Sequence, residues 1–288
     1  MNIYKKNPPN WSYDSITTEL LNFEKIYSER PIKDNQGGMK YPHMFALYFI
    51  LKNINPVFVV ESGIWKGQST WLIEKTLPNA NILSLDINLQ RREYISSSKK
   101  VTYSNKDFIN HDFSKIPINS LVYFDDHQNS YERLMQSYFF GFKNVIFEDN
   151  YPILRGDTYS IKKIFHRSGL NDKRAGFKDL IKVLIIILNH YLKKKIDKNY
   201  KNEIFKYNLS MQDVLPNENH FKNVDNIIET YYEFPPIFKT IKTRWGDNWT
   251  EEFYPTEKPI LDTSYKDKYK KAFEEAKNYN WLCYLKLK

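Results

Sequence analysis

Short apolar runs that end in acidic residues recur along the first half of the chain. They are VFVVES, NILSLDI, LVYFDD and NVIFEDN, which end at Glu61, at Asp86, at Asp125 and Asp126, and at Glu148 and Asp149. Unbroken runs rich in β-branched and aromatic residues are typical of strands buried on both faces of a parallel sheet. The pattern predicts an α/β fold with carboxylates gathered at the edge where open α/β sheets bind their ligands.

Helical spacing separates these runs. Residues 1–55 are predicted to be a helical preface, in which HMFALYFILKNI has apolar residues three and four apart before Pro56. A helix after the first strand ends before Pro78, and a helix in SYERLMQSYFF stops at Gly141. A third strand in TYSNKDF is expected to end near Asp107. The alternation predicts a mostly parallel sheet with helices on both faces.

The second half of the chain has a different pattern. Residues 177–195 are predicted to form a helix that is apolar in its middle and basic at its end, and residues 231–255 are aromatic without clear periodicity. A helix through residues 265–276 and a strand in WLCYLKLK follow. The pattern predicts a helical preface at residues 1–55 and a sheet domain in two segments, 56–160 and 256–288. Residues 161–255 are predicted to be a basic and aromatic insertion that binds substrate or makes interactions.

Composition excludes several classes of protein. The 288 residues are 41% hydrophobic, which is enough for a globular core. The single cysteine, Cys283, excludes an internal disulfide framework and is typical of a reducing cytoplasm. The N-terminus lacks the apolar segment of a secretory signal, and no run reaches the ~18 apolar residues of a membrane span. We therefore expect a soluble, cytoplasmic protein.

The net charge of +9 is concentrated in one stretch. Between Lys162 and Lys206 there are 13 Lys and Arg but 4 Asp and Glu, and the rest of the chain is close to neutral. The charge indicates a surface patch in a basic helical insertion. The helix at 177–195 is expected to bury its apolar middle against the domain or a second subunit, with peripheral binding to an anionic membrane as the alternative.

The turn after the first strand has the sequence Glu61-Ser-Gly63-Ile-Trp-Lys-Gly67. Glycines let the backbone approach a ligand closely, and the helix that begins at Gln68 and Ser69 presents free N–H groups. The spacing E-x-G-x-x-x-G differs from the G-x-G-x-x-G of dinucleotide enzymes. The difference argues against a pyrophosphate and favours a ligand without phosphate.

Asp86 ends the second strand 19 residues after Gly67, where an acid can accept both hydrogen bonds of a ribose diol. Two glycines beside a helix are often a tight turn and nothing more. Their combination with Asp86 favours a ligand.

Residues 40–152 resemble the class I S-adenosylmethionine-dependent methyltransferases in these motifs, although Ser62 stands where that family usually has an apolar residue. The resemblance implies a Rossmann-like sheet, with the two glycines beside the methionine part of the cofactor, Asp86 on its ribose and Asp107 near its adenine. The cofactor-binding residues that it implies are Glu61, Gly63, Gly67, Gln68, Ser69, Asp86 and Asp107.

Acids also gather at the ends of the next two strands, in FDDHQN and FEDN. Carboxylates at one point repel each other unless a positive charge lies between them, so a divalent cation is the simple explanation. Oxygen ligands without cysteine suit Mg²⁺ best, with Mn²⁺ or Ca²⁺ as alternatives. Helix caps and loop hydrogen bonds are the structural explanation of the same acids.

The pairing resembles the metal-dependent O-methyltransferases of the catechol type and of the macrolide-sugar type. The catechol type implies Asp126, Asp149 and Asn150 as metal ligands. The macrolide-sugar type implies Asp126, Glu148 and Asp149, so two aspartates are common to both.

The likeness to both types breaks at the base. Both place a Lys or His three residues after the first ligand, where this chain has Asn129, which cannot accept a proton. His127 or Asp125 are the candidate replacements; otherwise the metal alone acidifies the acceptor hydroxyl. For His127 a structural role is the more common one.

The acceptor is expected to lie against the segment that follows FEDN. Arg155, Asp157 and Tyr159 are the candidate substrate contacts. An aromatic cluster further along either stacks on a sugar ring or packs in the core, packing being the more common role; it consists of Trp245, Trp249 and Tyr254.

These features together predict a metal-assisted O-methyltransferase that uses S-adenosylmethionine and acts on a hydroxyl of a sugar or other small polar acceptor. A catalytically silent binding or assembly module in glycan or surface-polymer production is one alternative, motivated by the missing base. A nucleic-acid methyltransferase is the other. It is disfavoured because an N-P-P-Y-like tetrapeptide is missing from the strand ends, and NPPN occurs only at residues 7–10.

Overall fold

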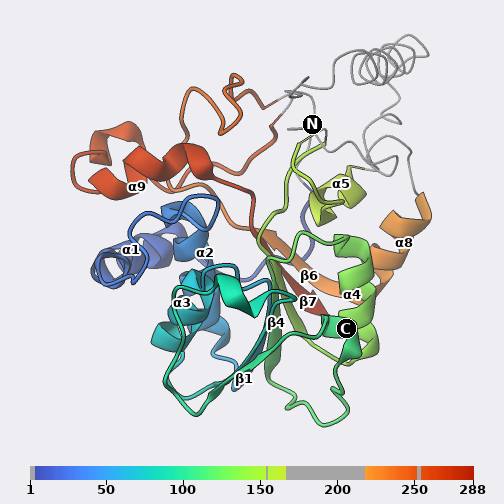
Figure 1. The fold of residues 1–288 in the computed structure, drawn as a ribbon. Helices are drawn as coiled ribbons and strands as arrows, with labels where there is room; N and C mark the ends of the chain where they lie inside the picture. The colour runs from blue at the N-terminus through green and yellow to red at the C-terminus, as the bar shows by residue number, and fades with distance from the viewer. Residues whose placement is uncertain (1–3, 154, 167–217, 252–253) are drawn as a thin grey trace, which may run out of the picture.

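The computed structural model describes residues 4–153, 155–166, 218–251 and 254–288. Within these residues the centre of the molecule is a seven-stranded sheet of order β3-β2-β1-β4-β5-β7-β6 (Figure 1). Its strands are β1 (Phe58–Ser62), β2 (Asn81–Leu85), β3 (Val101–Ser104), β4 (Ser120–Phe124), β5 (Asn144–Phe147), β6 (Ile228–Glu233) and β7 (Cys283–Leu287).

The strands from β1 to β5 are parallel, and β7 runs antiparallel between β5 and β6. In the register of the sheet, Ser62 pairs with Leu85 on one side and with Phe124 on the other, and Phe124 pairs with Phe147. The acids that follow these strands therefore emerge at one edge. The predicted mostly parallel, Rossmann-like sheet is confirmed.

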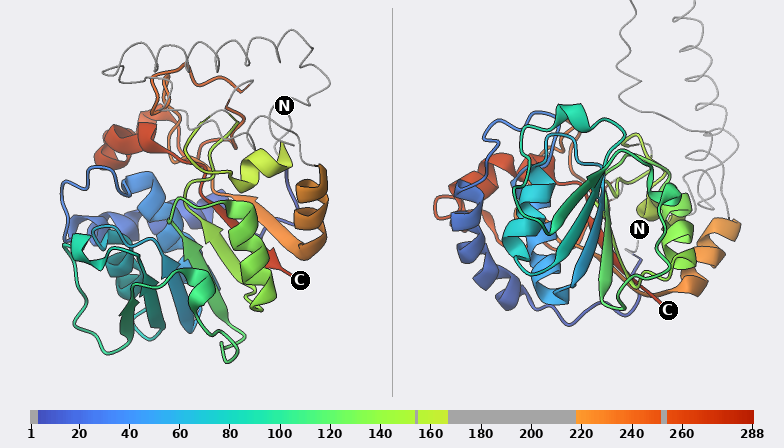
Figure 2. Two further views of the ribbon diagram at one scale, coloured as in Figure 1. Left: turned by 45° about the vertical axis from the view of Figure 1, so that its right-hand side comes forward. Right: turned by 60° about the horizontal axis from the view of Figure 1, so that its bottom comes forward.

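Helices cover both faces of the sheet (Figure 2). One face carries α1 (Tyr13–Ser28), α2 (Tyr41–Ile54), α3 (Gln68–Thr76) and α9 (Lys270–Glu275). The other carries α4 (Ser130–Phe139), α5 (Ile161–Phe165) and α8 (Glu218–Ile227). Short 3₁₀ turns complete the connections, at η1 (Leu89–Arg91), η2 (Phe108–Asn110), η4 (Thr263–Tyr265) and η5 (Ala276–Asn278).

Two apolar clusters form the core because successive strand residues point to opposite faces. Val59 packs in the cluster under α2, whereas its neighbour Val60 packs in the cluster under α4. Helix α2 is buried along most of its length, which explains why the preface is so apolar. The preface thus covers one face of the sheet and contributes to its core.

The sequence pattern did not reveal β6. Its residues IETYYE lack a clean alternation, and they lie inside the range 161–255 expected to be an insertion, yet β6 pairs with β7 in the main sheet. The helix expected through residues 265–276 is divided into η4, α9 and η5. The expected helix at 177–195 lies outside the described residues. Among the residues that are described, no helix is long and apolar enough to cross a membrane.

Candidate active site

A pocket of about 670 Å³ opens at the carboxyl ends of the parallel strands. This volume is in the usual range for small-molecule sites, about 300–1,000 Å³. Its wall comes from the preface around Met39 and His43, from the ends of β1, β2 and β4, and from the segments after β5 that hold Tyr151 and Arg244. The pocket therefore has a strand-end side and an opposite side built from later parts of the chain.

The glycine turn after β1 is shaped by steric necessity. Gly63 has φ +97° and lines the pocket, and a Cβ there would overlap the backbone carbonyl of Asp125. Gly67, with φ +94°, precedes α3, and a Cβ there would lie 2.5 Å from the carbonyl oxygen of Tyr94. L-residues with side chains rarely adopt this conformation. Both predicted glycines are thus required by the close approach of neighbouring backbone.

Asp86 closes the same turn. Its Oδ2 accepts hydrogen bonds from the backbone N–H groups of Ile64 and Trp65, each at 3.0 Å, and its Oδ1 accepts one from Asn88 at 2.8 Å. The carboxylate also lines the pocket. A carboxylate has about four lone-pair sites, so Asp86 can hold the turn and still accept a hydrogen bond from a ligand hydroxyl.

Three of the predicted cofactor residues lie behind the pocket wall. Glu61 is fully buried, where it accepts hydrogen bonds from Thr70 and Ser84, each at 2.6 Å, and burial raises its pKa. Gln68 is also buried, and its Oε1 accepts from the N–H of Ile32. The third, Ser69, is buried beside Glu61. These residues support the turn from beneath.

Arg133, on α4, joins the predicted adenine side to the predicted metal side. It makes two hydrogen bonds to Asp107, at 2.9 and 2.6 Å, and its Nε donates to Asp126 at 2.8 Å. The same Asp126 oxygen accepts from the hydroxyl of Ser62 at 2.8 Å, which gives this unusual serine a role. The guanidinium of Arg133 lowers the pKa of Asp107. Both aspartates line the pocket as partners of a buried cation.

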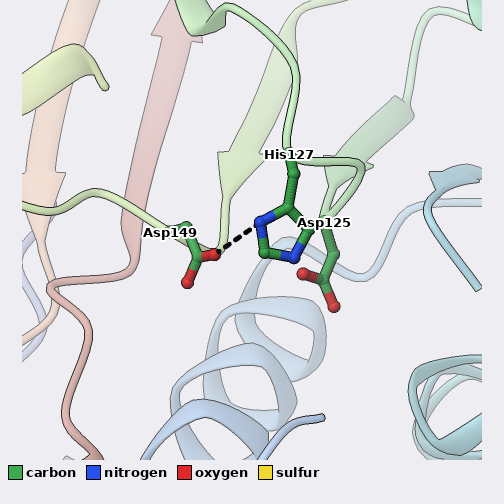
Figure 3. A group of neighbouring side chains, drawn as sticks. All are labelled: Asp125, His127 and Asp149. Carbon is green, nitrogen blue, oxygen red and sulfur yellow. Dashed lines mark ion pairs between the residues drawn. The ribbon is translucent and has the colours of Figure 1, made fainter. Parts of the chain in front are cut away.

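Asp125, His127 and Asp149 come together at the ends of β4 and β5 (Figure 3). Each offers one ligand atom, and the three atoms lie within 4.8 Å of one another. A single ion can bridge such atoms, since metal bonds to nitrogen and oxygen are about 2.0–2.6 Å long. The donor set of two carboxylates and an imidazole therefore fits a divalent cation. It contains the predicted ligand Asp149 and the two predicted bases, whereas the predicted ligand Asp126 is not part of it and is paired with Arg133.

The electrostatics of this cluster favour a positive charge. Burial, followed by the nearby Glu148 and Asp149, raises the pKa of Asp125 well above its usual value. Burial and Glu148 raise the pKa of Asp149 to about 8. A hydrogen bond to Asp157, opposed by burial, raises the pKa of His127 to about 10. The raised pKa values of the two carboxyls show that crowded negative charge is unfavourable at this point, so a bound cation would be stabilised there.

Two further contacts frame the cluster. The Nδ1 of His127 lies 3.3 Å from Asp149 and 3.0 Å from Asp157, in a residue with φ +53° that turns the ring into the pocket edge. Glu148 pairs with the buried His43 of α2, whose other ring nitrogen contacts the carbonyl of Asn278. Burial lowers the pKa of His43 to about 4. Glu148 is therefore anchored to the preface, although it lines the pocket.

Two asparagines take structural roles. Asn150 is fully buried, its Oδ1 accepts from the N–H of Lys162 at 2.6 Å, and its Nδ2 donates to Tyr231 and to the carbonyl of Trp281. This arrangement gives no support to Asn150 as a metal ligand. Asn129 caps α4, accepting from the first N–H groups of the helix, which explains why no base stands there.

The predicted substrate residues divide. Asp157 lines the pocket, whereas Tyr159 is buried and Arg155 bonds to Asp247 at 2.6 Å and to the hydroxyl of Tyr254 at 2.8 Å. In the aromatic cluster Trp249 and Tyr254 are buried packing residues, and Trp245 reaches the pocket wall.

Among the pocket residues that sequence reasoning missed, four contact elements far away along the chain. They are His43, Arg133, Tyr151 and Arg244. The local sequence pattern has no signal for such contacts, except that His43 is a histidine inside the apolar run of α2.

No family model matches the chain, and the search of curated proteins gives no match. Among solved structures, the plantazolicin methyltransferase BpumL in complex with a monoazolic desmethylPZN analog and SAH is 14% identical over 95% of this chain and 89% of that chain, with a TM-score of 0.39. CmcI with SAH is 15% identical over 51% of this chain and 81% of that chain, with a TM-score of 0.36. CmcI with Mg and SAM is 19% identical over 50% and 67%, with a TM-score of 0.33.

Likeness at this level does not bear on the activity, which has to be argued from the site itself. The strand order, with β7 antiparallel between β5 and β6, is that of a mostly parallel, Rossmann-like sheet, and the turn at Gly63 lies at its carboxyl edge.

Proposed function

We propose that this protein is an S-adenosylmethionine-dependent O-methyltransferase, assisted by a divalent cation, that acts on a hydroxyl of a small polar acceptor such as a sugar. The observation that carries the proposal is one pocket with two chemically different parts. The turn at Gly63 and the carboxylate of Asp86 line one part, and Asp125, His127 and Asp149 line the other.

The cofactor would supply the methyl group on a sulfonium sulfur. Gly63 leaves room beside the strand ends, Asp86 accepts from the ribose, and Asp107 stays ionised beside Arg133 near the adenine. A ligand held in this way is oriented before reaction, which removes much of the entropic barrier to transfer.

A divalent cation held by Asp125, His127 and Asp149 would lower the pKa of the acceptor hydroxyl. In the transfer, the acceptor oxygen forms a bond to the methyl carbon, and the carbon–sulfur bond breaks with its electron pair left on sulfur. The hydroxyl proton would leave to the carboxylate oxygen of Asp125 that does not hold the cation; Asp125 and His127 are the two predicted bases, and both line the pocket.

Calorimetry with S-adenosylmethionine, in the presence and absence of Mg²⁺, tests the proposal. We expect binding of the cofactor, and separate binding of Mg²⁺ that is lost in Asp149→Asn. Absence of binding of both the cofactor and its demethylated product would reject the methyltransferase assignment. Cofactor binding without any binding of Mg²⁺ or Mn²⁺ would reject the metal alone.

A further inference from the structure

The wall opposite the strand ends holds a cation that the proposed reaction does not use. Arg244 is exposed and lines the pocket together with Trp245, Tyr151 and Asp157. Among the described residues its hydrogen-bond partner is the hydroxyl of Tyr151, a neutral group. A guanidinium carries five N–H donors in a rigid fork, so most of its donors are left for another partner.

The turn that carries Arg244 is well fixed. The N–H of Thr243 donates to the carbonyl of Asp247 at 2.9 Å, and the N–H of Gly246 donates to Thr243 at 3.0 Å. Asp247 is paired with Arg155 at 2.6 Å. Trp245 stacks on Trp281 with 6.0 Å between ring centroids. These contacts fix the backbone that carries Arg244 at the pocket wall.

The Tyr151 hydroxyl that receives Arg244 is fixed as well. The side chain of Tyr151 is buried, its ring meets that of Trp245 edge to face at 5.2 Å, and a Cβ at Gly156 would overlap it. Arg244 also interacts electrostatically with Glu148 and Asp149 at the ends of β5. The guanidinium therefore lies beside the acid cluster, on the wall of the same pocket.

We propose that the acceptor carries an acidic group, a carboxylate or a phosphate. Arg244 binds this group while the hydroxyl of the acceptor faces Asp125 and Asp149. Planar guanidinium groups match both anions with paired hydrogen bonds. This inference rests on the proposed function, since it names the class of acceptor for the same pocket. A hydroxylated acid such as a uronic acid, or a phosphorylated sugar, has the required chemistry.

Binding of inorganic phosphate and of D-glucuronate, measured by calorimetry in saturating S-adenosylhomocysteine, tests the inference. The carboxylate of bound S-adenosylhomocysteine would fill the part of the pocket that takes the amino-acid end of the cofactor, so the probe cannot bind there. We expect at least one probe to bind the wild-type protein and D-glucose to bind more weakly. Arg244→Gln should lower the affinity for the probe about tenfold, because a charge-assisted pair of hydrogen bonds is lost.

Lys242→Gln is the matched control, because it removes one exposed charge from the same turn outside the pocket wall. We expect it to leave the binding of the probe unchanged, and Arg244→Lys to retain part of it. Equal binding in wild type and Arg244→Gln, or no binding of either anion, overturns the inference. An unchanged affinity for S-adenosylhomocysteine in Arg244→Gln shows that the variant is folded and that the cofactor assignment stands apart from this result.

Discussion

The cofactor end of the pocket and its acid end differ in how they are held together. At the cofactor end, backbone groups bond to a carboxylate only about one strand-helix-strand unit away, as when Ile64 and Trp65 donate to Asp86. At the acid end, titratable side chains meet: His43 of the preface contacts Glu148 after β5, and His127 contacts Asp157. One end is shaped by backbone geometry and the other by a balance of charges.

This difference predicts two kinds of sensitivity. Substitutions in the glycine turn should act through folding and shape, because backbone atoms cannot move aside. Substitutions in the acid cluster should act on chemistry with little loss of stability, because crowded buried carboxylates already repel each other and functional sites often cost stability.

Gly63→Ala should have the largest effect. Its Cβ would overlap the carbonyl of Asp125 at φ +97°, so we expect a loss of more than about 3 kcal/mol in the free energy of unfolding and no detectable cofactor binding. Denaturant unfolding and calorimetry measure both. Gly141→Ala is the control, since φ is +82° there but no atom lies within 4 Å, and it should cost about 1 kcal/mol. Equal effects of the two variants would remove the steric basis of the comparison.

Asp149→Asn tests the acid end. We expect turnover to fall by about 10²–10⁴-fold, binding of Mg²⁺ to be lost, and cofactor affinity to stay within about twofold. The melting temperature should be unchanged or higher, because a partly buried carboxyl beside Glu148 is replaced by a neutral amide. Asp112→Asn, an exposed acid outside the pocket, controls for a general charge effect. Full turnover of Asp149→Asn in chelator would refute the metal-assisted reaction.

The comparison also explains what was predictable. Strand ends, the glycine turn and Asp86 follow from local apolar runs and their punctuation, so the sequence revealed them. The sheet was predictable except for β6. Most of its residues are buried on either face, so they show no clear alternation, and its place in the sheet depends on pairing with β7, which is distant along the chain. The partner of Asp126 was not predictable, since Arg133 looks like any polar residue of an amphipathic helix until the strands and α4 are placed together.

Arg133→Gln tests whether the two ends are coupled. It leaves Asp107 and Asp126 without their shared buried cation, and we expect a loss of about 3 kcal/mol in stability together with weaker cofactor binding. Lys286→Gln is the control, because its pair with Glu229 is exposed, and it should change stability by less than about 1 kcal/mol. If Arg133→Gln lowers neither quantity, the two ends are independent.

Asp86 sharpens the comparison at its smallest scale, because the same carboxylate closes the turn and faces the pocket. Asp86→Ala removes both roles, so stability and cofactor affinity should fall together. Asp86→Asn keeps one oxygen for the N–H groups of Ile64 and Trp65 but loses the charge, so we expect about a tenfold loss of affinity for S-adenosylhomocysteine with less than about 1 kcal/mol lost in stability.

The two Asp86 variants therefore separate a ligand contact from a scaffold contact. Calorimetry with S-adenosylhomocysteine and denaturant unfolding are measured on each. If Asp86→Asn retains full affinity while Asp86→Ala loses it, Asp86 acts through the turn alone, and the ribose contact has to come from another group on the wall. If both variants lose affinity and only Asp86→Ala loses stability, the charge itself binds the ligand. The cofactor end would then depend on a charge as well as on backbone geometry, so both ends of the pocket would use carboxylate charge to bind their ligands.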